Sequence, residues 1–236
     1  MEKLLIIIPA YNEEKSIKFV VDKIKHKYKN YDYIVINDGS TDNTSQVCKE
    51  NGYNIIDLPV NLGVSAAMQT GMQYAYEQGY DYALQFDADG QHLPEYIPLL
   101  LKTIKKGYDV VIASRFLTVK KHFSLRMMGS AVISFLIKLT TRQKITDPTS
   151  GMRLYNRKLI EEFALNHNYD PEPDTMAFLI RNNASITEVQ VAMDVRKYGE
   201  SFFNILNSII FMVHMSISIL IIQWARKREG KYEHTA

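Results

Sequence analysis

A regular alternation of short apolar runs and helical stretches constrains the fold of this chain more than any other feature. Five apolar runs of strand length occur at residues 4–8, 33–36, 54–58, 82–86 and 109–114. Helical patterns separate them, at about 16–28, 41–51, 64–78 and 94–105. Such alternation predicts an α/β fold of Rossmann-like type, a mostly parallel sheet with helices on both faces.

Composition narrows the class of protein. The 236 residues have room for one sizeable domain and a smaller appendage. A formal net charge of +2 gives no strong positive electrostatic field that would attract nucleic acid, so no nucleic-acid partner is expected. The single cysteine, Cys48, excludes an intrachain disulfide or a cysteine zinc cluster, and we expect it to pack in the interior. The apolar run at 4–8 is too short for a signal peptide.

Polar clusters follow three of the predicted strands, at residues 11–13, 37–40 and 87–91. Ligands of open α/β sheets bind at the carboxyl ends of strands, so these clusters mark the expected site. Alternation along an extended segment would point Asp87 and Asp89 to one side. Two such carboxylates suit Mg²⁺ or Mn²⁺ holding phosphate oxygens, although a plain polar turn explains this segment equally well.

The cluster after the first run reads Pro9-Ala10-Tyr11-Asn12-Glu13-Glu14. Pro9 would end the strand, Tyr11 offers a flat face for a base, and Glu13 offers acceptors; a simple helix start is the alternative. Residues 37–42 allow the same two interpretations. Residues 61–63 (NLG) precede a helix whose N–H groups could face phosphate.

Five segments in order, IIIPAYNEE, VINDGSTDNT, NLGVSAAMQTGM, FDADGQHLPE and VIASRF, resemble the inverting nucleotide-sugar glycosyltransferases of family 2, which have the GT-A fold. The resemblance covers about residues 3–116. Downstream, the chain looks like the dolichyl-phosphate mannose synthase branch, which includes bacterial polyprenyl-phosphate glycosyltransferases. The matching residues are Ser114-Arg115, then Arg126 and Ser130, then DPTSGMRLY at 147–155, then a late segment, Arg196–Gly199.

The resemblance implies a role for each matching residue. Pro9, Tyr11, Glu13, Asp38 and Asp87 would bind the nucleotide sugar. Asp87, Asp89 and Gln91 would hold Mg²⁺ or Mn²⁺, which neutralises charge on the leaving diphosphate. Arg115, Arg126, Ser130 and Arg196 would bind the lipid phosphate, with Asp89, Arg115 and Arg126 as the catalytic set. Arg126 and Ser130 share a face of a predicted helix, and arginine binds phosphate bidentately.

In that branch the acceptor is a lipid phosphate, already an anion, so no general base is required. His92 is a weak candidate for a base, because a lone histidine after a turn is more often structural. The segment Tyr169-Asp170-Pro171-Glu172-Pro173-Asp174 departs from the more apolar stretch expected there. Glu172 and Asp174 would contact the sugar, the metal or nothing.

The second half of the sequence indicates that the protein lies at a membrane surface. Residues 201–225 carry no charge, and Arg226-Lys227-Arg228 follow them. A polar stripe and the positive-inside tendency favour an interfacial or re-entrant helix over a true span or a buried helix. A basic helix at about 120–142 would reinforce attachment to anionic lipid.

We therefore expect a glycosyltransferase domain at 1–200, with a nucleotide-sugar half at 1–116 and an acceptor half at 117–200, and a membrane-associated segment at 201–236. The expected reaction moves a sugar from a nucleotide sugar, with a UDP-sugar favoured as donor, to polyprenyl (undecaprenyl) phosphate at the cytoplasmic face of the cell membrane, for cell-wall or surface polysaccharide modification. One alternative is transfer to a saccharide hydroxyl in polysaccharide or teichoic acid assembly, for which a carboxylate such as Asp174 or Glu172 would have to supply the base. The other is a non-catalytic membrane scaffold. A nucleotidyltransferase would require a glycine-rich loop with a lysine near the N-terminus, and this chain lacks such a loop. Possible partners are a second copy or a small membrane protein.

Overall fold

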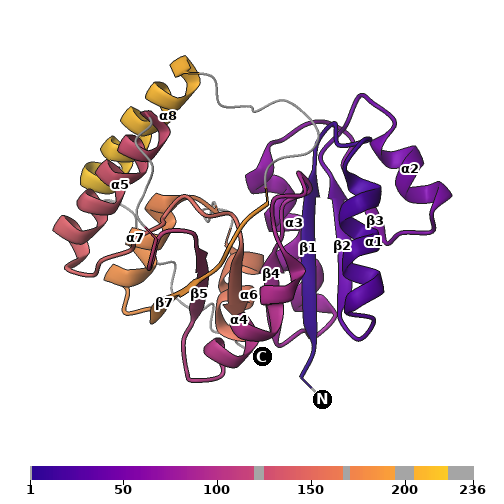
Figure 1. Ribbon diagram of the computed structural model, residues 1–236, viewed down its shortest axis with the longest axis horizontal. Coiled ribbons are helices and arrows are strands. Elements are labelled where there is room, and N and C mark those ends of the chain that lie inside the picture. Colours follow the sequence, from indigo (N-terminus) through magenta and orange to yellow (C-terminus); the bar gives the residue numbers. More distant parts are fainter. Residues whose placement is uncertain (1, 120–124, 167–170, 195–204, 223–236) are drawn as a thin grey trace, which may run out of the picture.

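The computed structural model describes residues 2–119, 125–166, 171–194 and 205–222. For residues 125–126, 205–209 and 222, which lie at helix ends, it describes the backbone alone. Its described strands form one seven-stranded sheet in the order β3-β2-β1-β4-β6-β5-β7 (Figure 1). The strands are β1 (Leu4–Ala10), β2 (Asp32–Asn37), β3 (Ile55–Asp57), β4 (Tyr82–Gln85), β5 (Val110–Ser114), β6 (Arg153–Asn156) and β7 (Ile186–Gln190). All neighbours are parallel except the pairs that β6 makes with β4 and β5. The prediction of a mostly parallel α/β sheet is confirmed.

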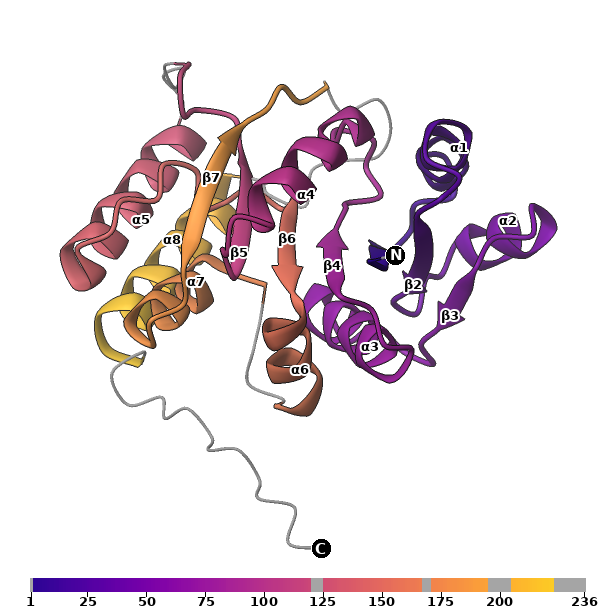
Figure 2. The same ribbon diagram turned by 90° about the horizontal axis from the view of Figure 1, so that it is seen from below.

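Helices cover both faces of the sheet, as expected (Figure 2). One face packs against α1 (Ile17–Lys27), α2 (Thr44–Glu50) and α4 (Ile97–Ile104). The other packs against α3 (Val64–Glu77), α6 (Arg157–Leu165) and α7 (Pro173–Arg181). On α3, Gly71 lies directly over Ile7 of β1, where a Cβ would collide with the isoleucine side chain. Because α3 packs this closely on β1, the loop that precedes it is fixed beside the end of that strand.

Two further helices pair beside the β5–β7 edge of the sheet: α5 (Leu125–Thr141) and α8 (Ile205–Ile217), with a π-helical turn, η2, at Ser218–Ile222 (Figures 1 and 2). Gly129 of α5 allows close contact, since a Cβ there would collide with the Met212 side chain of α8. Within the described ranges, no helix combines the length and apolar character needed to cross a bilayer.

Two details of the strand ends differ from expectation. Pro9 does not end β1, which continues to Ala10 and pairs Pro9 with Ile36 of β2. Proline has no N–H to donate to a neighbouring strand. The Ile7 carbonyl accepts from the Phe86 amide on the β4 side, and the backbone of Pro9 faces that same side. Because the pairing of β1 with β4 ends at Ile7, the missing N–H of Pro9 breaks no bond of the sheet. In addition, β4 ends at Gln85, so Asp87 and Asp89 lie in the turn after it rather than on extended chain.

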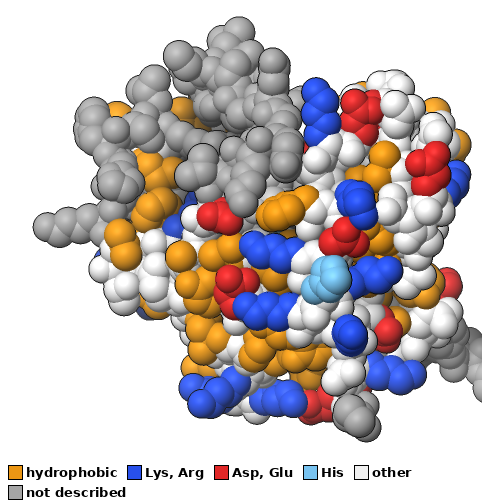
Figure 3. All heavy atoms as spheres, turned by 45° about the vertical axis from the view of Figure 1, so that its right-hand side comes forward, with side chains coloured by type: hydrophobic (Ala, Val, Ile, Leu, Met, Phe, Trp, Pro, Cys, Tyr) orange, Lys and Arg blue, Asp and Glu red, His pale blue; other side chains and the backbone are white. Residues whose placement is uncertain are grey.

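Charged side chains are intermixed on the face that carries α1 and α2. Figure 3 shows lysine and arginine interspersed with aspartate and glutamate there. Ion pairs join Lys18 to Asp22 at 2.8 Å and Lys49 to Asp57 at 2.6 Å. The excess of lysine in α1 is therefore partly balanced locally. Cys48 is fully buried, which confirms the expected packing role.

Candidate active site

The carboxyl ends of β1, β2 and β4 meet at one edge of the sheet, where the strand order reverses between β1 and β4. The loops carrying Tyr11, Asp38 and Asp87 begin there. Reversal of strand order opens a crevice between neighbouring loops, which is where α/β sheets bind ligands. The three predicted polar clusters are thus brought together.

Asn12 joins the first two of these loops. Its backbone lies in the left-handed region at φ 55°. The Asn12 Oδ1 accepts from the amide of Thr41 at 2.9 Å and from that of Asp42 at 3.3 Å. The backbone amide of Asn12 in turn donates to Oγ of Ser40 at 2.9 Å. Asparagine tolerates this backbone conformation better than most residues, so it serves as the connector.

Asp38 is buried and holds the loop that precedes α3. Its two carboxylate oxygens accept from the amides of Leu62 and Gly63, each at 2.8 Å. Gly39, at φ +62°, lies so close to the backbone of Val60 that a Cβ would collide with it. The amides of Leu62 and Gly63 are therefore engaged by Asp38, and phosphate would have to use the next amides of the helix.

Tyr11 and Glu13 lie on either side of Asn12 but differ in their surroundings. Tyr11 is 45% exposed, so its ring is accessible to a ligand. The Glu13 carboxylate accepts from the hydroxyl of Ser16, and its amide donates to Oγ1 of Thr44 at 2.8 Å. Glu13 thus stabilises the start of α1, as in the helix-start interpretation, while remaining half-buried at the loop.

The turn after β4 carries the predicted metal ligands. Gly90, at φ +79°, supplies the expected turn. The Asp87 side chain is 37% exposed, whereas Asp89 is buried and its Oδ1 accepts from the amide of Gln91 at 3.0 Å. The two carboxylates therefore differ in access, with Asp87 the more open of the pair.

His92 supports this turn from inside the protein. The ring is almost fully buried and packs edge-on against Phe86. Its Nδ1 accepts from the amide of Asp87 at 2.9 Å, so the proton of the neutral ring is on Nε2, which lies 3.5 Å from Oδ2 of Asp87. Both ring nitrogens are directed at Asp87, which favours a structural role over that of a base.

The acidic turn is compatible with a divalent cation. Among the described residues, no group of three or more histidine, cysteine or acidic side chains is arranged to hold a metal. Mg²⁺ usually takes one or two carboxylates and completes its shell with water and substrate phosphates. Asp87 and Asp89 supply such a pair, so the donor set fits a cation that arrives with a diphosphate.

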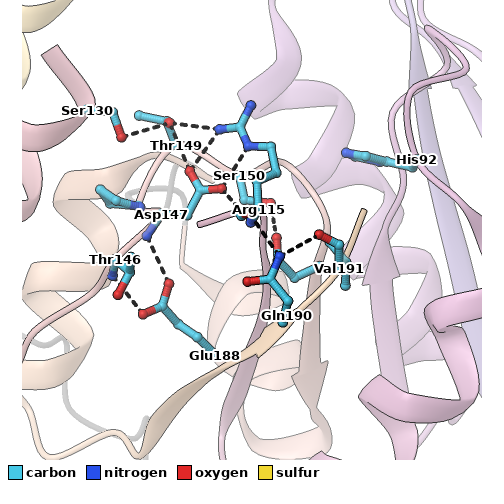
Figure 4. Close-up of polar contacts among 12 residues, drawn as sticks. His92, Arg115, Ser130, Thr146, Asp147, Thr149, Ser150, Glu188, Gln190 and Val191 are labelled. Atoms are coloured by element: carbon cyan, nitrogen blue, oxygen red, sulfur yellow. Dashed lines mark hydrogen bonds and ion pairs between the residues drawn. The ribbon is translucent and has the colours of Figure 1, made fainter. Parts of the chain in front are cut away.

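Arg115 lies on the side of the site that the sequence predicts to bind the lipid phosphate (Figure 4). Its Nε and Nη2 donate to the two carboxylate oxygens of Asp147 at 2.7 and 2.8 Å, and its backbone amide adds a third contact at 3.0 Å. Asp147 is fully buried, whereas the Arg115 side chain is 28% exposed. In the part of the chain that the structure describes, Nη1 of Arg115 has no acceptor. The pair therefore orients the guanidinium and leaves one edge for an anion.

Two hydroxyl groups extend this arrangement toward α5. Thr149 accepts from Nη2 of Arg115 at 3.3 Å and donates to Oγ of Ser130 at 3.5 Å. Ser130 is buried on α5, and Arg126 lies one turn earlier on the same helix. The two positions are four residues apart on α5, and the Arg126 side chain is outside the described part of the structure. Arg196 also lies outside the described residues.

Glu188 is a site-supporting residue that the sequence analysis missed. From β7, its carboxylate accepts from the amides of Thr146 at 2.7 Å and Asp147 at 2.9 Å (Figure 4). It thereby fixes the loop that carries Asp147. Residues 186–191 are expected to be extended from the sequence, but nothing in it indicates this contact, since the partners are 41 and 42 residues apart.

The two sides of the site touch at Asp87. Gly151 approaches its carboxylate so closely that a Cβ would collide with Oδ2. A second contact follows β7, where the Asp194 amide donates to the carbonyl of Gln91 at 2.9 Å. The acidic turn is therefore bordered by the loop that carries Asp147 and by the segment that leads to Arg196.

Arg153 of β6 lies beneath this junction as a buried cation. Its guanidinium donates to carbonyl oxygens of Pro148, Ser150 and Pro171 at 2.8–2.9 Å. Burial raises the pKa of the neighbouring Tyr155 hydroxyl, and the Arg153 charge opposes that rise. Arg153 thus ties the loop of Asp147 to the residues that begin α7.

The segment around Glu172 and Asp174 also has a defined place. It forms the start of α7, with Pro173 as the first helical residue. Asp174 Oδ2 accepts from the hydroxyl of Ser218 at 2.7 Å, and Oδ1 from the Thr175 amide at 2.7 Å. Both oxygens of Asp174 are engaged within the protein, which disfavours it as a base.

Comparison with known proteins shows which protein family this chain resembles. The model of the family described as Glycosyl transferase family 2 matches residues 5–163. A UDP-N-acetylglucosamine–dolichyl-phosphate N-acetylglucosaminyltransferase of Methanococcus voltae is 32% identical over 224 residues, covering 84% of this chain and 88% of that protein. Polyprenol monophosphomannose synthase of Mycolicibacterium smegmatis is 28% identical over 213 residues, 85% of this chain and 80% of that protein.

Solved structures agree on the fold. Glucosyl-3-phosphoglycerate synthase from Mycobacterium tuberculosis, in complex with phosphoglyceric acid, superimposes with a TM-score of 0.71 at 19% identity, covering 97% of this chain and 82% of that one. The same enzyme with Mn²⁺ and UDP-glucose gives a TM-score of 0.68 at 19% identity, with 97% and 81% covered. The sheet with its strand-end loops is thus a glycosyltransferase fold of GT-A type, and the chain belongs to glycosyl transferase family 2 and is a glycosyltransferase.

Proposed function

We propose that this enzyme transfers a sugar from a nucleotide sugar to polyprenyl phosphate at a membrane surface. The observation that carries the proposal is the Arg115–Asp147 pair, which presents an arginine edge next to the hydroxyls of Thr149 and Ser130. Arginine held in this way suits a phosphate group. The names of the relatives support the same acceptor, since they include transferases that act on dolichyl phosphate and undecaprenyl phosphate.

The two halves of the site divide the reaction. On the donor side, Tyr11, Glu13 and Asp38 border the nucleoside, with Pro9 in the strand beneath. A divalent cation held by Asp87 and Asp89, with Gln91 beside them, would neutralise charge on the departing nucleoside diphosphate. On the acceptor side, Arg115, Arg126, Ser130 and Arg196 bind the lipid phosphate.

The acceptor is its own nucleophile. A phosphate oxygen attacks C1 of the sugar from the side opposite the diphosphate. The new C1–O bond forms as the old one breaks, its electrons leave with the nucleoside diphosphate, and the anomeric centre inverts. No proton has to be removed, which agrees with the engagement of His92 and Asp174 by other groups. Transfer to a saccharide hydroxyl would need a base, and these contacts disfavour His92 and Asp174 in that role.

The surface of α5 and α8 supports a membrane location. Exposed apolar side chains form one stripe on each helix: Met128, Val132, Phe135 and Leu139 on α5, and Ile210, Val213, Ile217, Leu220 and Ile221 on α8 and η2. Contiguous exposed apolar surface of this kind marks an interaction site. We propose that this paired surface lies in the headgroup region of the cytoplasmic leaflet, where nucleotide sugars are present.

Introducing a charge into this apolar surface tests whether the surface contacts the membrane. Replacing Phe135, which is 62% exposed, with aspartate should release much of the protein from vesicles, because the charge must enter the apolar layer. Flotation with vesicles containing anionic lipid measures this. Val60→Asp changes another exposed apolar residue, 55% exposed, in the segment that precedes α3; it is the matched control and should float as the wild type does. Equal flotation of all three proteins would contradict the assignment.

A radiolabel transfer assay tests the reaction. Purified protein with Mn²⁺ or Mg²⁺ and polyprenyl phosphate is offered UDP-glucose, UDP-N-acetylglucosamine and GDP-mannose in turn. One donor should give an organic-extractable, acid-labile labelled lipid, and a chelator should suppress it. Nucleotide binding without a lipid product from any donor would contradict the proposal and favour the scaffold alternative.

A further inference from the structure

A buried hydrogen bond connects η2, the π-helical turn that continues the apolar helix α8, to the start of α7. The hydroxyl of Ser218 donates to Oδ2 of Asp174 at 2.7 Å, and Ser218 is only 3% exposed. Ser218 is the first residue of the π-helical turn η2, where the helix is locally widened. Single π-helical turns are rare and frequently occur at functional positions. A charge-assisted bond in this place is stronger than an ordinary hydroxyl bond.

The start of α7 is held from its other side by Arg153. The guanidinium donates to the carbonyl of Pro171 at 2.9 Å and reaches that of Glu172 at 3.5 Å. The same guanidinium donates to the carbonyls of Pro148 and Ser150. These two carbonyls belong to the loop that carries Asp147. One short segment, residues 171–174, is therefore fixed both to the acceptor loop and to α8.

The opposite face of α8 is the exposed one. Met215 and Ile219 are buried next to Ser218, whereas Val213, Ile217 and Leu220 point outward. Ser218 thus lies on the inner side of a helix whose outer side carries the apolar stripe. The hydrogen bond to Asp174 is a fixed point between the membrane-facing surface and the site.

We propose that Asp174 and Ser218 are positioning residues that set the acceptor loop at a fixed height above the bilayer. The proposal rests on the function proposed above. A polyprenyl phosphate has its phosphate at the membrane surface, so the arginine that binds it must sit at a defined distance from the lipid. The Asp174–Ser218 bond, continued through Arg153, fixes that distance.

A polar bond suits this task because it has direction. Apolar contacts are non-directional and tolerate sliding of one helix along another. A hydrogen bond weakens steeply when its angle or length changes. Here it selects one register of α8 against α7 among the many that apolar packing alone permits.

Ser218→Ala removes the bond with little change of volume. Ser216→Ala is the matched control, because the Ser216 hydroxyl donates only to the Met212 carbonyl of its own helix, at 2.7 Å. Asp174→Asn keeps an acceptor for Ser218 but removes its charge. Each full-length variant is assayed with a long polyprenyl phosphate in phosphatidylethanolamine and phosphatidylglycerol vesicles, and with a short water-soluble prenyl phosphate without vesicles.

The bilayer acceptor should respond selectively. We expect Ser218→Ala to lower its kcat/KM about tenfold, and Asp174→Asn about threefold, with the KM for the nucleotide sugar unchanged. Both variants should use the short acceptor within about twofold of the wild type, and Ser216→Ala should match the wild type with both acceptors.

Two results would overturn the positioning role. Equal losses with the two acceptors would show that the bond only maintains the site, and wild-type rates with Ser218→Ala would show that it is dispensable. Failure of the proposed function looks different, since the wild-type protein would then label neither acceptor.

Discussion

The donor and acceptor sides of the site are held by different kinds of bond. On the donor side, loops at the ends of β1 and β2 are joined through backbone amides, as between Asn12 and Thr41 or between Asp38 and Leu62. On the acceptor side, charged groups are held against one another or against carbonyls inside the protein, as in Arg115–Asp147 and Arg153.

The difference indicates where each side is sensitive to change. A carboxylate that accepts from amides at a loop can be partly replaced by water. A charge whose partner is removed in the interior has no such substitute. We therefore expect mutations of supporting residues to cost more stability on the acceptor side, and to affect acceptor use before donor use.

The largest expected loss of stability comes from Asp147→Ala. The change leaves the Arg115 guanidinium without its carboxylate and the Thr149 hydroxyl with one acceptor fewer. Because Arg115 is partly exposed, we expect the lower end of the range for a broken buried pair, about 3 kcal/mol of the free energy of unfolding. Urea denaturation measures it. A loss below about 1 kcal/mol would remove the contrast between the two sides.

A smaller effect is expected for Asp38→Ala on the donor side. The amides of Leu62 and Gly63 lose their acceptor, which should cost about 2 kcal/mol. The KM for the nucleotide sugar should rise while that for polyprenyl phosphate stays unchanged, and steady-state kinetics with each substrate varied separates them. Asp38→Asn, which retains one acceptor, is the milder control. A larger change in the acceptor KM would contradict the division of the site.

The smallest effect is expected for Asp109→Asn, at the edge of the sheet opposite the site. Burial alone would raise the Asp109 pKa, but hydrogen bonds from Ser185 and Asn156 outweigh it and leave the pKa below the ordinary 3.8. The carboxylate therefore stabilises the fold above about pH 4, and this contribution is lost as the pH falls through its lowered pKa.

Asp109→Asn should thus cost about 1 kcal/mol at neutral pH, and the difference from the wild type should shrink on acidification. Thermal unfolding across pH measures this, with kcat/KM at neutral pH as the control. Lost activity without lost stability would place Asp109 in the site after all.

The strand-end residues were predictable because their positions follow from local patterns. Apolar runs placed β1, β2 and β4, and parallel pairing then required Tyr11, Asp38 and Asp87 to share an edge. The direction of Asp87 and Asp89 was not predictable in this way, because the strand ends before them and the turn decides their exposure.

The supports of the acceptor side were not predictable from local patterns. Glu188 meets Asp147 only because β7 pairs with β5 at the sheet edge, far from Asp147 in sequence. Arg153 lies on β6, and nothing in the sequence of residues 147–155 shows that its partners are carbonyls from two loops. Long-range polar contacts of this kind depend on the assembled sheet.

A comparison of acceptors tests whether the phosphate of a lipid is the nucleophile. The wild-type enzyme, with its preferred labelled donor and Mn²⁺, is offered vesicles containing polyprenyl phosphate, polyprenol of the same length, or a soluble oligosaccharide. We expect labelled product with polyprenyl phosphate alone, since only that acceptor reaches Arg115 as an anion and needs no base. Transfer to polyprenol or to the oligosaccharide at a comparable rate would contradict it.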